Sequence, residues 1–370
     1  MRVFISAGLF YPSKLGGPAN TLYWLAKGLV AKDLKVSVVT SSNYIEKGLV
    51  EFNKWTTLGK IRIRYCSSKT KFSLNIIWHS IKEIRKSDVV LLSSLFFLPS
   101  FFISLFLLFS SKRIIWSPRG ELFESAINGS KSKLLFVSLL KMIFAKRVIF
   151  HATSPEEKRQ IEKYFGANVK TIIIPNYIEL PKQQTRKDTI KNYFLFVGRI
   201  APIKALDNLL LGLAKSDAFI SSDYKLLIAG GVEKQFEDYH AQLQQIIENN
   251  DMLKERVVFL GNVEGEEKYK LYANAFFSVL VSHSENFGNV VLEALSQGTP
   301  VIASQGTPWK KLVDNKAGFW ISNTEDDIVN CIEKAINIGE EEYLGYRNNA
   351  LKLAQEFDIY KNIDLWIQVI

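Results

Sequence analysis

Residues 285–300 read E-N-F-G-N-V-V-L-E-A-L-S-Q-G-T-P. Seven residues separate Glu285 from Glu293, and the polar turn N-F-G-N lies between an apolar run at 276–281 and the helix-like V-V-L-E-A-L. A strand that runs through a turn into a helix is the repeating unit of a parallel α/β sheet. The N–H groups and the positive dipole end at such a helix start favour an anion. The stretch therefore predicts a parallel sheet with an anion-binding helix start between two carboxylates.

The same alternation of apolar strand-like runs and helix-like stretches continues along the chain. Its 370 residues exceed the usual size of one hydrophobic core, so we expect two domains. A polar stretch at 179–192 reads as a linker between residues 1–178 and 193–356. Two Rossmann-like halves would form a deep cleft, with ligands at the carboxyl ends of their strands. The expected strands lie at 3–6, 35–40, 61–65, 89–92, 113–116, 147–151, 171–174, 193–197, 225–229, 256–260, 277–281 and 300–303.

The net charge of +10 is distributed unevenly along the chain. Residues 1–188 carry 30 Lys and Arg against 12 Asp and Glu, whereas residues 189–370 carry 17 against 25. A basic half indicates an anionic partner surface, and we find no nucleic-acid-binding signature, so an anionic membrane is favoured over nucleic acid. Basic and apolar residues alternate in K-S-K-L-L-F-V-S-L-L-K-M-I-F-A-K-R at 131–147, as in a helix lying on a bilayer. An ordinary amphipathic surface helix has the same pattern.

The apolar run at 89–109 is long enough to raise the question of a transmembrane helix. Pro99 and four serines interrupt it, so we expect a buried strand followed by an apolar helix, with a membrane-embedded helix as the alternative. The N-terminus lacks the cleavage site of a signal peptide, which predicts a cytoplasmic protein. Cys66 and Cys331 lie far apart, and neither they nor the four histidines have metal-like spacing, so we expect reduced thiols and no zinc.

Three segments of the second half should meet at the carboxyl edge of its sheet. Arg199 and Lys204 follow the strand at 193–197, and a guanidinium fork with an ammonium suits a diphosphate, although a solvated loop has the same composition. Gly230 lies in a glycine turn after another strand, where a ligand can approach the backbone. Glu293 lies about one turn into the helix after N-F-G-N, where a carboxylate can accept hydrogen bonds from two adjacent ribose hydroxyls. Either glutamate alone reads as a surface charge, but together with the turn they indicate a site.

These segments resemble the retaining, nucleotide-sugar-dependent glycosyltransferases of family 4, whose GT-B fold has two facing Rossmann-like domains. Similar proteins build bacterial capsules, lipopolysaccharide O-antigens and exopolysaccharides. The resemblance implies that a final helix at 357–370 packs back on the first domain. It covers nearly the whole chain and rests on G-G-P-A-N at 16–20, S-P-R-G at 117–120, H-A-T-S at 151–154, I-P-N at 174–176, F-V-G-R-I at 196–200 and the block at 284–303.

The resemblance also implies roles for individual residues. Arg199 and Lys204 would hold the donor diphosphate and neutralise charge on the leaving group, and Glu285 would hold sugar hydroxyls. Glu293 would bind the ribose, and a loop of the first domain would close over the phosphates. The further donor-binding residues would be Gly16, Gly17, Gly198, Gly230, Asn286, Phe287, Gly288 and Asn289. On the acceptor side the candidates are Asn20, Arg119 and His151. The fold usually works without a metal ion, and no D-x-D motif is in place, so no metal cofactor is expected.

Three positions depart from the family pattern. Ala205 stands where a glycine usually follows the lysine, Ser93 where a histidine often ends the fourth strand, and Ile359 where tryptophan is common. The change to Ser93 removes one candidate acceptor-site group. A dehydrogenase would need G-x-G-x-x-G, and an epimerase or a phosphorylase lacks supporting residues here.

The sequence therefore predicts a hexosyltransferase that moves a UDP- or GDP-linked sugar to a cell-surface glycan. A lipid-linked acceptor at the inner membrane face is the hypothesis that the basic first half suggests. The alternative from another class is a non-catalytic scaffold subunit of a polysaccharide assembly complex, which the intact basic and acidic site residues disfavour.

Overall fold

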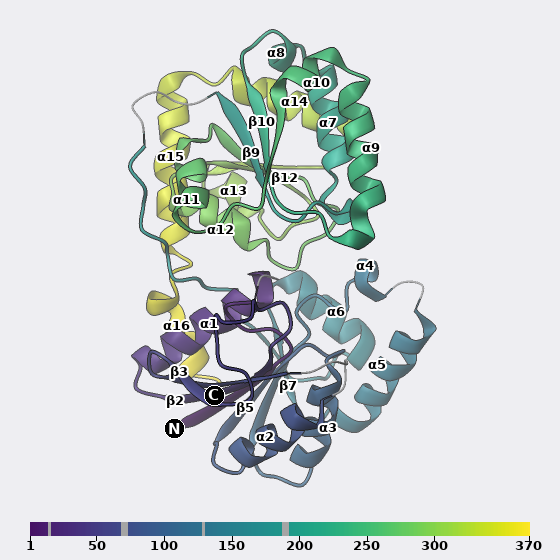
Figure 1. Cartoon of the computed structure of the whole chain (residues 1–370), viewed down its shortest axis with the longest axis vertical. Coiled ribbons are helices and arrows are strands. Elements are labelled where there is room, and N and C mark those ends of the chain that lie inside the picture. Colours follow the sequence, from purple (N-terminus) through teal and green to yellow (C-terminus); the bar gives the residue numbers. More distant parts are fainter. Residues whose placement is uncertain (14–15, 68–72, 128–129, 187–191) are drawn as a thin grey trace. The chain divides into compact units, whose positions relative to one another are not determined.

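The computed structural model describes residues 1–13, 16–67, 73–127, 130–186 and 192–370 (Figure 1). The chain divides into two compact units. One contains Met1–Glu179 together with Asp358–Ile370, and the other contains Leu180–Phe357. The first boundary lies one residue from the sequence-based limit of 178, and the second lies one residue from 356. The expected linker begins at the first boundary, and its residues 187–191 lie outside the described part of the chain.

In its described residues, the first unit contains an eight-stranded sheet with the order β3-β4-β2-β1-β5-β6-β7-β8. Neighbouring strands run parallel except at the edge, where β3 pairs antiparallel with β4. The strands are β1 (Arg2–Ala7), β2 (Lys35–Ser41), β3 (Trp55–Leu58), β4 (Ile61–Cys66), β5 (Val89–Ser93), β6 (Arg113–Ser117), β7 (Ile149–Ala152) and β8 (Thr171–Ile173). The helices are α1 (Gly16–Ala31), α2 (Leu74–Ile84), α3 (Leu98–Leu107), α4 (Glu124–Ile127), α5 (Lys131–Phe144), α6 (Pro155–Phe165) and α16 (Ile359–Ile367).

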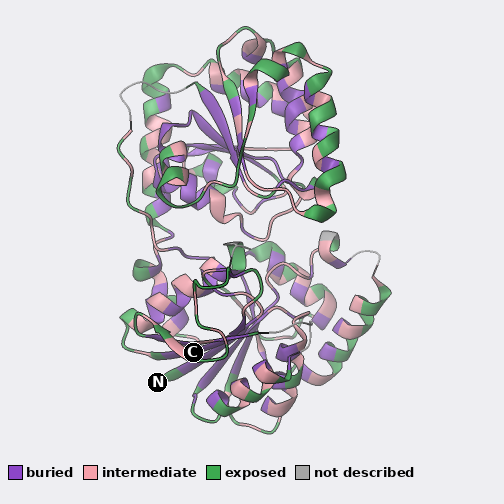
Figure 2. Ribbon diagram, viewed as in Figure 1, coloured by how far each residue is buried: buried purple, intermediate pink, exposed green. Residues whose placement is uncertain are grey.

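Helices cover both faces of this sheet, so its central strands are apolar on both sides. Phe4, Val90 and Trp116, on three neighbouring strands, are completely buried, and Figure 2 shows the strands as the buried centre of the unit. The apolar run at 89–109 forms β5 and then α3, which confirms the prediction of a strand followed by a helix. No helix in the described part of the chain combines the length and apolar character needed to cross a membrane.

The final helix, α16, packs against α1. A Cβ atom built on Gly28 of α1 would lie 2.8 Å from Ile359 Cγ1 and 2.9 Å from Ile363 Cδ1, so the glycine permits a close approach of the two helices. Lys32 and Asp364 form an ion pair of 2.7 Å beside this contact. The chain thus returns to the first unit after it completes the second.

In the part of the second unit that the structure describes, a six-stranded parallel sheet has the order β11-β10-β9-β12-β13-β14. Its strands are β9 (Tyr193–Val197), β10 (Lys225–Ala229), β11 (Val257–Gly261), β12 (Phe277–Leu280), β13 (Val301–Ser304) and β14 (Gly318–Ile321). The α-helices are α7 (Leu206–Lys215), α8 (Asp217–Ile220), α9 (Glu237–Glu248), α10 (Asp251–Arg256), α11 (Gly265–Asn274), α12 (Asn289–Ser296), α13 (Lys311–Asp314), α14 (Glu325–Ile336) and α15 (Glu340–Gln355). Two short 3₁₀ helices complete the unit, η1 (Pro202–Lys204) and η2 (Lys234–Phe236).

The strand order of the second unit determines where a ligand can bind. Counted within the unit, the order is 3-2-1-4-5-6, and it reverses between the neighbouring strands β9 and β12. In open α/β sheets the chain leaves such a pair of strands toward opposite faces, and ligands commonly bind beyond their carboxyl ends. The loops after β9 and β12 contain Gly198–Lys204 and Glu285–Asn289, which are the segments selected from the sequence. The first unit has the same reversal between β1 and β5.

Candidate functional site

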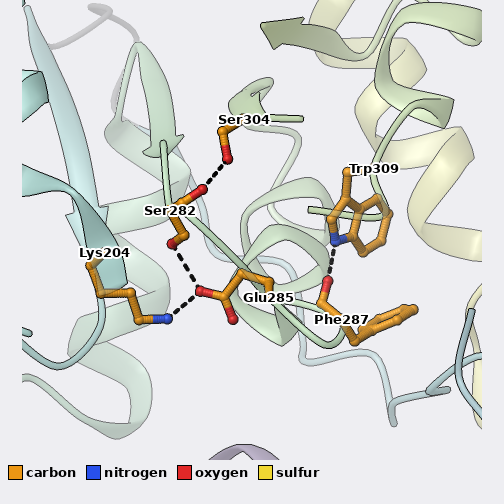
Figure 3. A network of polar contacts seen from close by, with 6 residues as sticks. All are labelled: Lys204, Ser282, Glu285, Phe287, Ser304 and Trp309. Carbon is orange, nitrogen blue, oxygen red and sulfur yellow. Dashed lines mark hydrogen bonds and ion pairs between the residues drawn. The ribbon is translucent and has the colours of Figure 1, made fainter. Parts of the chain in front are cut away.

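The centre of the candidate site in the second unit is an ion pair between Lys204 and Glu285 (Figure 3). Lys204 ends η1 after β9, and Glu285 lies in the loop between β12 and α12, so the pair bridges the strand-order reversal. Each side chain is only 15% exposed. The Ser282 hydroxyl also donates to Glu285 Oε1, at 2.9 Å. The carboxylate is therefore fixed by two donors from two loops.

Backbone contacts hold these loops together independently of any ligand. The N–H of His283 donates to the carbonyl of Ile203 at 2.9 Å, and the N–H of Glu285 donates to the carbonyl of Gly306 at 2.8 Å. A Cβ atom on Gly306 would lie 2.4 Å from the His283 carbonyl oxygen, so only glycine fits there. The loops after β9, β12 and β13 thus form one preorganised edge.

Ala205 provides the turn that places Lys204. It has φ 51° and ψ 42°, a left-handed conformation, between the end of η1 and the start of α7. Its side chain is completely buried. The departure from the family glycine is therefore accommodated in the conformation for which glycine is the usual residue.

The N-F-G-N turn leads directly into α12. Gly288 has φ 79° at the N-cap position of α12 and, being glycine, has no side chain of its own to cap the helix. The Phe287 carbonyl accepts a hydrogen bond from Trp309 Nε1, and the two rings pack edge to face at 5.1 Å (Figure 3). The Phe287 ring also packs against Phe357, so its side chain is buried within the protein. The turn is anchored by this aromatic cluster, and its contribution to a ligand would come from the backbone.

Glu293 is a buried carboxylate, not a surface charge. Lys268 Nζ donates to Glu293 Oε1 at 3.0 Å, and the Tyr272 hydroxyl donates to Oε2 at 3.5 Å. Both donors lie on α11. Burial, together with the neighbouring Glu293 charge, raises the pKa of Tyr272 well above its usual value, which keeps the phenol protonated as a donor. The structure thus holds Glu293 in a fixed orientation.

Arg199 and the two strand-end glycines lie beside this edge. Arg199 is 53% exposed and pairs with Glu233 at 2.8 Å, and its hydrogen bond lowers the pKa of that carboxyl. A Cβ atom on Gly230 would lie 1.7 Å from the Gly198 carbonyl oxygen, and the Gly198 N–H donates to Ala229. The structure therefore explains Gly230 by backbone packing between two loops, while the Arg199 guanidinium is half-exposed and paired with a carboxylate of its own unit.

The first unit contains two residues predicted to bind the donor, Gly16 and Gly17, and the acceptor-side candidates Asn20, Arg119 and His151. Gly16 and Gly17 begin α1, and the Gly17 carbonyl accepts from the Thr21 hydroxyl at 2.9 Å. A Cβ atom on Gly17 would have nothing within 4 Å, so its surroundings are open. Asn20 lies half-buried on the same helix. Exposed Gly17 and half-buried Asn20 thus lie in the first turns of α1, the helix that follows β1.

His151 is enclosed by its own unit. Its Nδ1 lies 3.0 Å from the Ser117 hydroxyl, its Nε2 lies 2.8 Å from the Ile174 carbonyl oxygen, and its ring packs on Trp366. Burial, with the charge of Arg119, lowers the pKa of His151 to about 3, so the imidazole is neutral at physiological pH. This placement argues against direct contact with an acceptor. The His151 side chain, on β7, instead connects the end of β6 with the segment after β8 through its two ring nitrogens.

Arg119 has a strained backbone and a mostly enclosed side chain. Its φ is 56°, and its Nη1 donates to the Asn176 side chain at 3.1 Å. Burial lowers the pKa of Arg119 to about 10, against the opposing charge of Glu157. The guanidinium is therefore charged at neutral pH and is positioned at the carboxyl end of β6.

The sequence analysis did not select two carboxyl groups near Arg119, those of Glu157 and Glu121. Glu157 is completely buried and accepts from the N–H groups of Gly120 at 2.6 Å and Thr153 at 2.7 Å, which ties the S-P-R-G loop to α6. Glu121 accepts from the Ser94 hydroxyl and the Leu95 N–H, each at 2.5 Å. Burial raises the pKa of Glu121 to about 7. Only Glu157 had a sequence signal, the S-x-x-E capping box at 154–157.

Within the described residues, no three His, Cys, Asp or Glu side chains gather as a metal-ligand set would. The edge described above combines cationic side chains with the start of a helix.

Two units with parallel sheets of this strand order, and with site residues at the carboxyl ends of the strands, define the GT-B fold. Residues 178–353 match the family model of the glycosyl transferases group 1, so the chain contains a glycosyltransferase domain of that family. This match confirms the resemblance to glycosyltransferases for the second half of the chain.

Individual proteins agree with this classification. The O-antigen chain mannosyltransferase RfbU of Salmonella typhimurium is 31% identical over 186 residues, 50% of each chain. The O-antigen chain mannosyltransferase C of Escherichia coli is 24% identical over 100% of this chain and 98% of its own. Alr3699/HepE of Anabaena, solved with UDP and glucose, covers 100% of both chains with a TM-score of 0.76 at 18% identity, which shows the fold. The chain spans half or less of the length of the first curated relatives that it matches.

Proposed function

We propose that this protein is a metal-independent, retaining hexosyltransferase that moves a sugar from a UDP- or GDP-linked donor to a growing cell-surface glycan. The observation that carries the proposal is the Lys204–Glu285 ion pair beside the start of α12, with Glu293 buried in that helix. This arrangement lies in the glycosyl transferases group 1 domain. The names of two relatives, both O-antigen mannosyltransferases, and the UDP bound in a protein of the same fold support the choice of reaction and donor.

In this proposal the donor diphosphate lies against Lys204, Arg199 and the N-terminal end of α12. The ammonium, the guanidinium and the helix dipole neutralise the charge that develops as the C1–O bond to phosphate breaks. A bound diphosphate would take over the Lys204 charge, which frees Glu285 to accept hydrogen bonds from sugar hydroxyls. Glu293 would accept from the ribose hydroxyls, in competition with Lys268.

Retention would follow from attack on the same face of the sugar. The acceptor oxygen forms its bond to C1 on the face from which the phosphate oxygen departs, and that phosphate oxygen takes the acceptor's proton. This route needs no enzymic nucleophile and no metal ion, because basic side chains hold the leaving group.

For the acceptor we propose a lipid-linked glycan at the cytoplasmic face of the membrane. The support is α5, where Leu135 and Met142 are 75% and 77% exposed and Lys131 and Lys141 flank them. Apolar side chains with neighbouring lysines fit the interface of an anionic bilayer. The protein would then be peripheral on that membrane, and the first unit would meet the acceptor.

The reaction is tested by transfer of radiolabelled sugar from UDP- and GDP-sugars into a bacterial membrane fraction that supplies the acceptor. We expect incorporation by the wild type and a loss of about 10²- to 10³-fold in Lys204→Ala, because one charge-stabilising group is removed. Lys352→Ala, at an exposed lysine on α15, is the matched control and should keep full activity. No incorporation from any donor would favour a non-catalytic scaffold.

Membrane association is tested by co-sedimentation with vesicles that contain phosphatidylglycerol. The double variant Leu135→Ser/Met142→Ser should bind less than the wild type at low salt. Leu344→Ser, at a leucine 48% exposed in the second unit, should bind equally well. Equal binding by all three proteins, or none by the wild type, would reject α5 as the contact.

A further inference from the structure

A cavity of about 490 Å³ lies at the amino edge of the first unit's sheet. It is bounded by the starts of β1, β2 and β4 and by the last residues of α1 and α2. Asn20, near the start of α1, and Arg119, in the loop after β6, lie toward the opposite, carboxyl edge of the sheet. Within the first unit the cavity is therefore separate from the residues to which a part in sugar transfer has been given. Five basic residues line it, Arg2, Lys35, Lys60, Arg62 and Lys86.

Two of these cations share one carboxylate of the protein. Glu83 is buried, and its carboxylate pairs with Arg62 at 2.9 Å and with Lys86 at 3.8 Å. Arg62 also lies over the Trp55 ring, 3.9 Å from its centroid. Arg62 and Lys86 thus serve a structural ion-pair network at one wall of the cavity.

The other three cations have no such compensation. Within the part of the chain that the structure describes, the side chains of Arg2, Lys35 and Lys60 lie beyond ion-pair distance of any carboxylate. Asp33 is the second acidic residue of the lining, so the lining as a whole has a net charge of +3. Arg2, Lys35 and Lys60 are exposed, so water weakens their mutual repulsion, and an anion between these three strand starts would remove it.

We propose that this cavity binds a phosphorylated ligand. A phosphate or diphosphate group carries two to three negative charges, which would balance the positive charges of Arg2, Lys35 and Lys60. The volume falls within the range of small-molecule sites, roughly 300–1,000 Å³. Val30, Leu34 and Val36 form an apolar wall that can take the carbon part of such a ligand.

The simpler explanation is that these cations complement the negative C-terminal ends of α1 and α2. That effect falls off within the last turn of a helix, and α2 already has Lys82 in its last turn. It does not explain basic residues at the starts of β1 and β2 and directly before β4. The phosphate chemistry itself is common to free phosphorylated metabolites and phospholipid head groups, so the experiment needs one arm for each.

The test uses the full chain and two probes, pyrophosphate in isothermal titration and vesicles of phosphatidic acid in co-sedimentation. The cavity variant is Lys35→Glu/Lys60→Glu. The control is Lys47→Glu/Lys170→Glu, which makes the same change in net charge at two exposed lysines of the same unit outside the cavity. Because the donor site remains intact in both variants, the difference between them reports the cavity alone.

We expect the wild type and the control to bind a second pyrophosphate that the cavity variant does not bind, or the cavity variant to lose at least ten-fold in affinity for the vesicles while the control matches the wild type. A loss for pyrophosphate supports a soluble phosphorylated ligand, and a loss for vesicles alone supports a head group. Equal affinities of both variants for both probes would overturn the proposal and leave the helix-end explanation. If the charge reversal prevents folding, Lys35→Ala/Lys60→Ala with Lys47→Ala/Lys170→Ala as control provides the same comparison.

Discussion

Ala205 shows how one residue fixes the geometry of the candidate site. Its left-handed conformation turns η1 into α7 and so directs Lys204 toward Glu285. That conformation costs a non-glycine residue about 1–2 kcal/mol. Against this cost stand a buried methyl group, worth about 0.8 kcal/mol, and an unfolded chain less flexible than with glycine, worth about 0.4–1 kcal/mol. The opposing contributions are similar, which explains why alanine is tolerated at a glycine position.

We therefore expect Ala205→Gly to change the free energy of unfolding by less than about 0.5 kcal/mol. Ala205→Val should cost about 2 kcal/mol or more, because a β-branched side chain is strained in this conformation and has no room in the interior. Urea unfolding of the second unit measures both. A stable Ala205→Val protein would contradict the backbone conformation described for this residue.

Glu121 gives the first unit a distinctive pH dependence. Burial raises its pKa from 4.5 to about 7. Below pH 4.5 the carboxyl is protonated in both the folded and the unfolded chain. Between pH 4.5 and 7 only the folded chain keeps the proton, so stability falls as the pH rises, by about 3 kcal/mol in total. His151 acts in the opposite direction, because its lowered pKa removes stability as the pH falls below 6.5.

Comparing the pH dependence of stability in the wild type and in Glu121→Gln separates the effect of Glu121 from that of His151. Glutamine keeps a carbonyl oxygen as hydrogen-bond acceptor but does not ionise. Because His151 is present in both proteins, its contribution cancels in the difference between them. We expect the stability of Glu121→Gln relative to the wild type to rise by about 3 kcal/mol between pH 4.5 and 8. Urea unfolding of the first unit across this range measures it. A difference that stays constant with pH would show that Glu121 is ionised throughout.

At the residue scale the sequence could indicate which side chains matter, but not their partners. Lys204, Glu285 and Glu293 were selected from motifs, yet their contacts depend on residues 81 and 25 positions away. His151 illustrates the limit, since its motif says nothing of the Ser117 and Ile174 groups that enclose it. Glu121 had no signal, because its burial depends on the loop after β5.

At the scale of elements, two mid-helix glycines offer a matched comparison. Gly28 lies on α1 against α16, and a Cβ there would press on Ile359 and Ile363. Gly345 lies on α15, and a Cβ there would have nothing within 4 Å. Alanine in a helix interior is favoured over glycine by about 0.8–1.0 kcal/mol, whereas overpacking costs about 1–3 kcal/mol. Substitution by alanine should therefore stabilise the protein at Gly345 and destabilise it at Gly28.

We expect Gly345→Ala to slow hydrogen exchange in α15 and Gly28→Ala to speed it in α16. The first change adds helix propensity alone, and the second pushes α16 away from α1. Mass spectrometry of peptides from each helix measures both in separate samples. Equal protection of α16 in Gly28→Ala and the wild type would mean that the two helices are not in the close contact described.

The elements themselves were largely predictable because parallel strands buried on both faces have a strong apolar signal. The twelve expected strands all appear, with ends shifted by one or two residues. The two that were missed, β3 and β14, are four residues long and lie at sheet edges. Their sequences, W-T-T-L and G-F-W-I, are too short for periodicity to identify. They become strands because an existing sheet offers them a partner, which is a tertiary effect.

For the molecule as a whole, each unit has a different predicted partner. The first half of the sequence has 30 basic and 12 acidic residues, and the second has 17 and 25. The basic half contains α5 and the phosphate cavity, whereas the acidic half contains the proposed nucleotide site. These features are all explained if the first unit binds the acceptor and the second unit binds the donor. It requires that a nucleotide bind through residues of the second unit.

The measurement that tests this claim most directly is isothermal titration of the full chain with UDP, GDP and ADP. The account predicts that UDP or GDP binds, that Glu293→Ala weakens its binding at least ten-fold, and that Glu341→Ala, at an exposed glutamate of α15, leaves it unchanged. Saturation should also stabilise the protein, by about 2.7 kcal/mol at a hundred times the dissociation constant. If no nucleotide bound, or if Glu293→Ala bound it as tightly as the wild type, the proposed donor site would be wrong.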